Sequence, residues 1–202
     1  MFILVGLGNP GTEYEHTRHN TGALVLEVFR RAKELPEWVE DKKRRAFVSE
    51  GKVGKHTVLL VFPQTYMNKS GESLKIQDSR FKIQVKAKNK EIPNLVVIHD
   101  DLDIPFGKFK ISFNKSSGGH RGVESIIKAV KTQAFVRVRV GIASSAAATR
   151  KSQDESAVEK TILGKFAPVE LAGLKKLARR ISEGLACLVA EGREKAMSQY
   201  HS

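Results

Sequence analysis

The sequence has 202 residues, of which 41% are hydrophobic and 28% charged, and this composition excludes an intrinsically disordered chain. Its length suits one compact domain over residues 1–202. With 35 Lys and Arg against 22 Asp and Glu, the formal net charge is +13, which predicts a polyanionic partner such as nucleic acid.

Cysteine content and apolar runs exclude further classes of protein. Cys187 is the only cysteine, so the chain cannot form an intrachain disulfide or a cysteine-rich metal site. The apolar runs are far shorter than the roughly 20 residues that span a bilayer, so we expect no membrane association. The strand-like run at 2–5 has no signal segment before it. The cytoplasm and, in a eukaryote, the mitochondrial matrix both suit such a chain.

Strands and helices alternate along the sequence. Short runs rich in Val, Ile and Phe predict strands, and apolar residues at helical spacing predict helices between them. The predicted strands span residues 2–7, 46–53, 56–62, 94–98, 108–113 and 135–142. The predicted helices span residues 23–35, 69–81, 123–130 and 168–197. This alternation predicts an α/β sandwich.

The loop after the first strand contains a glycine motif with two interpretations. Residues 6–11, Gly-Leu-Gly-Asn-Pro-Gly, formally match the dinucleotide fingerprint, which would indicate a nicotinamide or flavin enzyme. That fold needs a helix starting inside the glycine run, whereas residues 12–21 are polar and lack an apolar helical period. We therefore favour the other interpretation, in which the glycines let the backbone and the Asn9 amide approach a ligand.

Three of the six histidines are candidates for chemistry. His19 and His120 each lie just before a predicted helix, and His99 ends a strongly apolar strand. The sequence has no nucleophilic Ser in a G-x-S-x-G elbow and no metal-ligand spacing such as H-E-x-x-H. A histidine that takes a proton from water is the chemistry that remains.

A carboxylate next to such a histidine would fix its tautomer and stabilise the imidazolium. Asp100 is the candidate because it follows the 94–98 strand, whose carboxyl end should face the ligand site. Asp101 and Asp103 compete for this role, and a helix or turn cap is the alternative for Asp100.

The C-terminal part contains one polar segment and one long predicted helix. Residues 144–154 have no apolar period and predict an exposed mobile loop. Leu174, Ile181 and Leu188 share one stripe of the amphipathic helix 168–197, which should pack on the sheet. The basic residues mostly outside this stripe are expected to face solvent, with nucleic-acid binding as the alternative. They are Lys175, Lys176, Arg179 and Arg180.

Four segments together resemble the bacterial-type peptidyl-tRNA hydrolase family, in order and in spacing. They are residues 6–20 with Tyr14 and Thr-Arg-His-Asn, residues 63–71, residues 99–103 and residues 118–120. The resemblance covers essentially the whole chain. It implies a monomeric α/β fold, a single-domain three-layer sandwich with a twisted mixed sheet flanked by helices, and no metal or other cofactor. It also implies hydrolysis of the ester between a peptide and the tRNA 3′ end, which recycles the tRNA.

The resemblance also implies roles for individual residues. His19 would activate water and Asp100 would hold His19 in place. Asn9 and Asn68 would bind the peptide or terminal adenosine and help to stabilise the oxyanion. The other substrate-binding positions would be Tyr14, Asn20, Met67, His120 and Arg121, with core packing as the alternative for Tyr14 and Met67.

Basic residues on two predicted strands match the family's clamp on the tRNA 5′ phosphate. Lys110 and Arg139 are the matching pair, and Lys108 and Arg137 share their strands at a spacing of two. Strand alternation puts each pair on one face, which suits a shared phosphate site. For Lys108 and Arg137, a plain solvent-facing role is the alternative.

Arg121 departs from the family pattern, which usually has Asn after Gly-Gly-His. Arginine adds charge and donors but cannot accept a hydrogen bond. Either Arg121 turns outward to phosphate, or the family's means of holding water is absent. This departure supports the alternative function, a non-catalytic RNA-binding relative like the splicing factors of this family.

Overall fold

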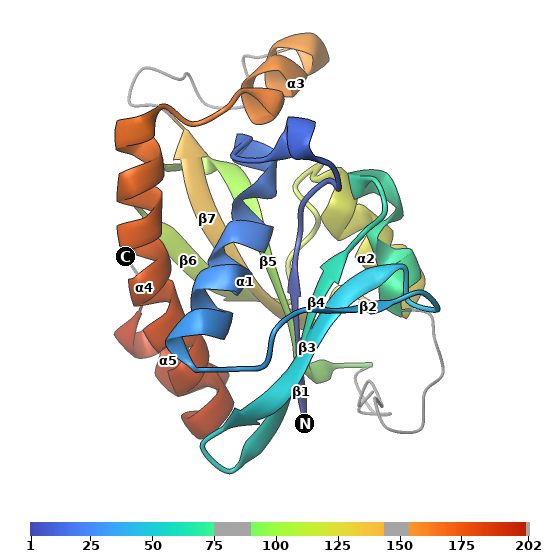
Figure 1. The fold of residues 1–202 in the computed structure, drawn as a ribbon, viewed down its shortest axis with the longest axis vertical. Helices are drawn as coiled ribbons and strands as arrows, with labels where there is room; N and C mark the ends of the chain where they lie inside the picture. Colours follow the sequence, from blue (N-terminus) through green and yellow to red (C-terminus); the bar gives the residue numbers. More distant parts are fainter. Residues whose placement is uncertain (75–89, 144–153, 201–202) are drawn as a thin grey trace.

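The computed structural model describes residues 1–74, 90–143 and 154–200, and within them seven strands form one mixed sheet (Figure 1). The strands are β1 (Phe2–Gly6), β2 (Val39–Asp41), β3 (Ala46–Val53), β4 (His56–Pro63), β5 (Ile92–Pro105), β6 (Phe109–Phe113) and β7 (Phe135–Ala143). Their order in the sheet is β2-β3-β4-β1-β5-β7-β6. The four central strands run parallel, and the pairs β2–β3, β3–β4 and β6–β7 are antiparallel.

Helices cover both faces of the sheet. The α-helices are α1 (Thr21–Ala32), α2 (Arg121–Val130), α3 (Glu155–Leu163), α4 (Pro168–Glu191) and α5 (Arg193–Gln199). The 3₁₀ helices are η1 (Thr12–Tyr14), η2 (Arg18–Asn20) and η3 (Met67–Leu74). Helices α1, α4 and α5 pack on one face, and α2 and η3 pack on the other (Figure 1). Among the described residues, no helix has both the length and the apolar character to cross a membrane.

Strand alternation builds a separate core on each face of the sheet. In β1, Leu4 belongs to the core under α1 and α4, whereas Ile3 and Val5 belong to the core under α2 and η3. All three side chains are buried. The predicted α/β three-layer sandwich with a twisted mixed sheet is therefore confirmed.

The six predicted strands are present, and two differences have local reasons. Strand β5 extends to Pro105, beyond the predicted end at 98, because the polar run after Ile98 continues to pair with β7. Strand β2 was not predicted, since its three residues are too few to show a period of two.

The helical predictions are confirmed in place but not always in type. Residues 69–74 of the predicted helix 69–81 belong to the 3₁₀ helix η3, which begins at Met67, and residues 75–81 lie outside the described part of the chain. The predicted helix 168–197 is two helices, because Gly192 adopts φ 96° and ends α4. The predicted stripe of Leu174, Ile181 and Leu188 is buried.

The predicted loop 144–154 lies outside the described residues except for Asp154. Asp154 is the N-cap of α3, whose Ala157 N–H donates to Asp154 Oδ1 at 2.7 Å. Helix α3 is a further element that was not predicted. Val158 and Ile162 show its one-turn spacing.

Close packing at the carboxyl ends of β1 and β5 positions the loops that carry polar residues. Leu7 N donates to Ile98 O at 3.0 Å. Gly22, in the first turn of α1, lies so near this point that a Cβ there would be 2.2 Å from Ile98 O. Only glycine permits this approach. The turn before α1 is consequently held at the end of β5.

Candidate active site

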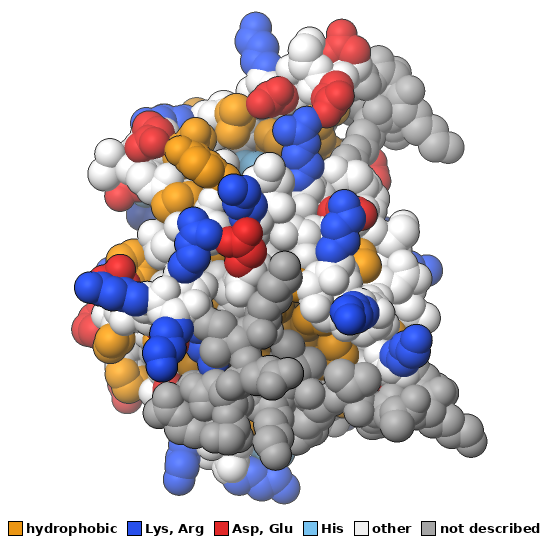
Figure 2. All heavy atoms as spheres, turned by 90° about the vertical axis from the view of Figure 1, so that its right-hand side faces the viewer, with side chains coloured by type: hydrophobic (Ala, Val, Ile, Leu, Met, Phe, Trp, Pro, Cys, Tyr) orange, Lys and Arg blue, Asp and Glu red, His pale blue; other side chains and the backbone are white. Residues whose placement is uncertain are grey.

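A pocket of about 820 Å³ opens at this edge of the sheet. It lies among the β1 loop, the end of β5, the start of η3, the start of α2 and one side of α3. Figure 2 shows a histidine side chain recessed in a hollow, with Lys and Arg side chains spread over the surrounding face. The sequence-predicted residues in the pocket wall are Asn9, Tyr14, His19, Met67, Asn68, Asp100, His120 and Arg121. The pocket therefore brings together residues of all four motif segments, which are far apart in the sequence.

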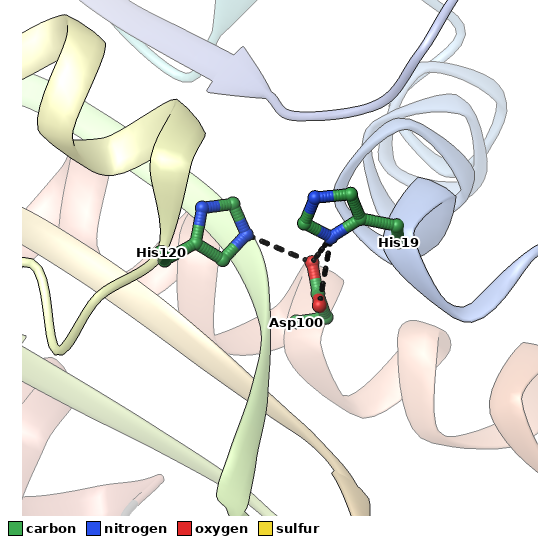
Figure 3. A group of neighbouring side chains, drawn as sticks. All are labelled: His19, Asp100 and His120. Atoms are coloured by element: carbon green, nitrogen blue, oxygen red, sulfur yellow. Dashed lines mark hydrogen bonds and ion pairs between the residues drawn. The ribbon is translucent and has the colours of Figure 1, made fainter. Parts of the chain in front are cut away.

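His19 and Asp100 form a buried pair in the wall of this pocket (Figure 3). His19 comes from η2 and Asp100 from β5. The Nδ1 atom of His19 lies 3.0 Å from each carboxylate oxygen of Asp100. A carboxylate accepts hydrogen bonds, so His19 carries its proton on Nδ1, and Nε2 keeps the lone pair of a base.

The turn that carries His19 is fixed to the segment between α3 and α4 and to the first turn of α4. Arg18 N donates to Gly164 O at 2.9 Å. The Arg18 guanidinium donates to both carboxylate oxygens of Glu170 at 2.8 Å and lies over the Phe166 ring. These contacts restrict the backbone on which the imidazole stands.

His120 is a second histidine on the same carboxylate (Figure 3). Its Nδ1 accepts hydrogen bonds from Gly122 N at 3.1 Å and Val123 N at 3.3 Å, as the N-cap of α2. Because Nδ1 is an acceptor, the ring proton lies on Nε2, which donates to Asp100 Oδ1 at 2.9 Å. His120, which the sequence interpretation made a substrate ligand, lines the pocket and also supports Asp100.

The charge state of Asp100 follows from these two donors. Burial opposes ionisation of the carboxyl, but His19 and His120 outweigh it and hold the pKa of Asp100 well below its usual range. Asp100 is consequently a carboxylate at neutral pH, able to stabilise positive charge on His19.

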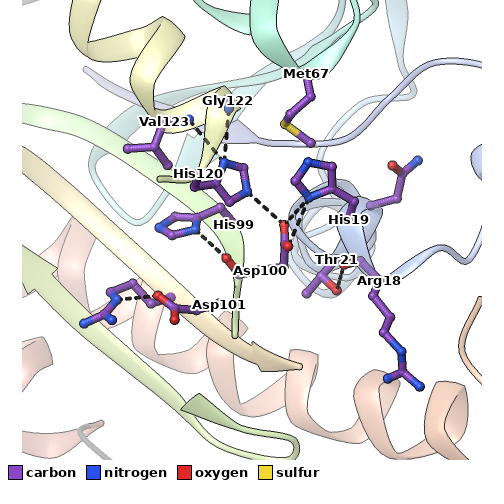
Figure 4. A network of polar contacts seen from close by, with 12 residues as sticks. Arg18, His19, Thr21, Met67, His99, Asp100, Asp101, His120, Gly122 and Val123 are labelled. Carbon is purple, nitrogen blue, oxygen red and sulfur yellow. Dashed lines mark hydrogen bonds and ion pairs between the residues drawn. The ribbon is translucent and has the colours of Figure 1, made fainter. Parts of the chain in front are cut away.

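His99 lies next to His120 and has a different role (Figure 4). Its Nδ1 donates to the backbone oxygen of Asp100 at 2.6 Å, and its ring meets that of His120 edge-on at 4.8 Å between centroids. Complete burial, helped by His120 and Arg137, lowers the pKa of His99 well below its usual range. His99 therefore stays neutral and supports the end of β5.

A hydrogen bond to its side-chain oxygen fixes the orientation of the Asn9 amide. Its Oδ1 accepts from Met67 N at 2.8 Å, which leaves the Nδ2 donors for a ligand. Asn20 bonds both backbone polar groups of Asn9, accepting from N at 2.8 Å and donating to O at 2.9 Å. The structure does not place Asn20 in the pocket wall. Because its amide is used on Asn9, its contribution is to position that residue.

One cluster of metal-ligating side chains occurs in the described ranges, and it is His19, Asp100 and His120 themselves. Their ligand atoms lie within 4.8 Å of one another. A metal ion here would have to displace the two N–H protons that now bind Asp100. The cluster is thus already satisfied by its own hydrogen bonds.

A family model described as peptidyl-tRNA hydrolase matches residues 3–202. The chain belongs to the peptidyl-tRNA hydrolase family. A peptidyl-tRNA hydrolase of Desulforudis audaxviator is 38% identical over 202 residues, which cover 100% of this chain and 94% of that protein. One of Thermodesulfovibrio yellowstonii is 36% identical over 202 residues, covering 100% and 99%. The crystal structure of the Acinetobacter baumannii peptidyl-tRNA hydrolase is 28% identical, with a TM-score of 0.81, covering 100% and 95%.

These similarities confirm the family and the enzyme class predicted from the sequence, and they do not favour the non-catalytic alternative. The dinucleotide interpretation also loses support from the structure. After Gly11 the chain forms the short 3₁₀ helices η1 and η2, and α1 begins only at Thr21. Within the described chain, no helix starts inside the glycine run, which the dinucleotide fold requires. The glycine loop instead places Asn9 in the pocket wall.

The predicted phosphate clamp has Lys110 on β6 and Arg139 on β7, with Lys108 just before β6. Lys110 and Arg139 are neighbours across the two strands, and Arg139 Nε donates to Asp101 Oδ2 at 2.7 Å. Lys108 and Lys110 are exposed. The solvent-facing alternative for Arg137 is wrong, because its side chain is buried under the α2 face. Burial and the nearby Arg139 lower the pKa of Arg137 to about 10.

Sequence reasoning missed the α3 wall of the pocket. Glu155, Val158, Ile162 and Leu163 line it, together with Glu159. The signal was present as an N-capping Asp154 followed by apolar residues one turn apart. The polar run at 144–154 was predicted to be a loop, and the short helix directly after it was therefore overlooked.

Proposed function

We propose that this chain hydrolyses the ester between a peptide and the 3′-terminal ribose of tRNA, with His19 as general base. The observation that carries the proposal is the buried His19–Asp100 pair, which leaves Nε2 of a pocket-lining imidazole as the proton acceptor. The family of its relatives supports the substrate class, and the net charge of +13 suits a polyanion.

In the first step, His19 Nε2 takes a proton from water while the water oxygen attacks the ester carbonyl carbon. Asp100 stabilises the imidazolium that forms. Negative charge then develops on the carbonyl oxygen, and the Asn9 Nδ2 donors are the groups that the protein has oriented for it. When the intermediate collapses, the bond to the ribose oxygen breaks, and the imidazolium returns its proton to that oxygen.

The remaining wall residues suit the substrate's two halves. Asn68 is exposed in the pocket, and Met67 is buried below it, with Tyr14 on the glycine-loop side. We assign Asn68 to polar groups of the peptide or terminal adenosine, and Met67 and Tyr14 to its apolar surface.

We further propose a monomeric protein that works in the cytoplasm.

A hydrolysis assay tests this function. Purified protein incubated with N-acetylaminoacyl-tRNA is expected to release N-acetyl amino acid and intact tRNA, because the ester is the bond attacked. Release is measured by acid precipitation of labelled substrate. Tight binding of this substrate without ester cleavage would instead identify a non-catalytic RNA-binding protein.

The clamp makes a separate prediction about tRNA binding. We propose that Lys108, Lys110 and Arg139 hold the 5′ phosphate of the acceptor stem. Replacing the exposed Lys110 by Ala should weaken tRNA binding and reduce the slope of log K against log salt by about one unit, because one fewer counterion is released. Lys175→Ala, on the exposed side of α4, is the matched control. A slope unchanged from wild type in the Lys110→Ala variant would remove Lys110 from the interface.

A further inference from the structure

Arg121 links two walls of the pocket. It is the first residue of α2 and lines the pocket, and its Nη2 pairs with Glu155 Oε1. Glu155 is the first residue of α3 and lines the pocket from the other side. Figure 2 shows acidic and basic side chains next to each other beside the hollow. The pair therefore joins the α2 and α3 sides of the pocket wall.

This ion pair is weak enough to be exchanged. The side chains of Arg121 and Glu155 are 60% and 82% exposed, and exposed pairs contribute little because water screens them. A cation in the first turn is also opposed by the helix dipole, so Arg121 does not stabilise α2. An anion of higher charge density, placed nearby, would compete well for the guanidinium.

Two backbone N–H groups at this helix end are already used within the protein. Gly122 N and Val123 N already donate to His120 Nδ1. The guanidinium of Arg121 is a charged donor group that the start of α2 offers to a ligand, and its planar fork matches two phosphate oxygens.

The tRNA substrate carries anions close to the ester bond that is hydrolysed. The ester that the activated water attacks is attached to the last ribose, so the nearest fixed negative charges are the phosphodiesters of the terminal nucleotides. We propose that Arg121 binds a phosphodiester of the last nucleotides of the tRNA, and that Glu155 competes with this phosphate for the guanidinium. This inference rests on tRNA being the substrate, and it makes Arg121 and Glu155 a pair that sets affinity for the 3′ end.

The test measures binding of deacylated tRNA at fixed salt by fluorescence anisotropy. Arg121→Asn is expected to weaken binding by about three- to tenfold, because a charged hydrogen bond is lost. Glu155→Gln is expected to tighten binding by about two- to fivefold, because the competitor for Arg121 is removed. In the Arg121→Asn background, Glu155→Gln should lose this gain. Glu159→Gln, which removes the same charge from the same wall, is the control and should act equally in both backgrounds.

A tRNA lacking its last two nucleotides locates the contact. With this shortened tRNA, Arg121→Asn and Glu155→Gln should no longer affect each other. Coupling that persists with the shortened tRNA would place the phosphate elsewhere and overturn the proposal. Equal effects of Glu155→Gln in both backgrounds would also overturn it, since only general electrostatics would then remain. The measurement needs no turnover, so a failure here is distinguishable from a failure of the hydrolytic function.

Discussion

His19→Ala is expected to lower kcat for N-acetylaminoacyl-tRNA hydrolysis by about 10²- to 10⁴-fold. Without the imidazole, water must attack without losing its proton to a base at the same moment. KM should change much less, because the residues assigned to substrate binding remain. Quenched single-turnover assays at neutral pH measure the chemical step directly.

A matched histidine variant separates this effect from general damage. His16 lies three residues earlier on the same loop and is exposed, with φ 63°. His16→Asn should keep turnover near wild type, since Asn tolerates this backbone conformation. Turnover of folded His19→Ala within a few-fold of wild type would refute His19 as the general base.

Asp100→Asn is the second large effect, and we expect a similar loss in kcat, about 10²- to 10⁴-fold. The carboxylate now accepts from Nδ1 of His19 and Nε2 of His120. An amide has one acceptor oxygen for these two donors, and its NH₂ group favours the His19 tautomer with the proton on Nε2. That tautomer has no lone pair facing the substrate. Stopped-time hydrolysis assays with saturating substrate give kcat.

Asp103→Asn is the control in the same acidic run, because Asp103 is exposed and its backbone N–H bonds to Asp101. It should behave like wild type. Circular dichroism and thermal melting show whether each variant is folded, since Asp100 is buried and its loss affects packing. A folded Asp100→Asn protein with normal kcat would mean that His19 does not need this carboxylate.

Residue identity and short-range pattern account for much of the fold. The periods of two and of helical spacing predicted six strands and the helices that cover the sheet. They failed where an element is short, as at β2, or where backbone geometry changes, as at Gly192. They also failed at α3, where a polar run precedes the helix. In each case the sequence pattern was too weak to predict the element, and tertiary packing selected it.

For the candidate site too, the sequence predicted the residues but not all of their contacts. The motif segments indicated Asn9, His19, Asp100 and Asn68, and all four line one pocket. The pattern did not indicate that His120 supports Asp100, nor that Asn20 holds the backbone of Asn9. These contacts depend on where the ends of separate elements meet, which no local period records.

By itself, the sequence determined the charge, the set of chemical groups and the family to which they belong. The tertiary structure decided how those groups are used: which nitrogen of each histidine carries a proton, and which residue of α3 faces Arg121. His19 and Asp100 are 81 positions apart in the chain, and Arg121 and Glu155 are 34 apart. Hydrogen bonds act over about 3 Å. Only the packing of β5, α2 and α3 around one sheet edge brings such distant residues within that range.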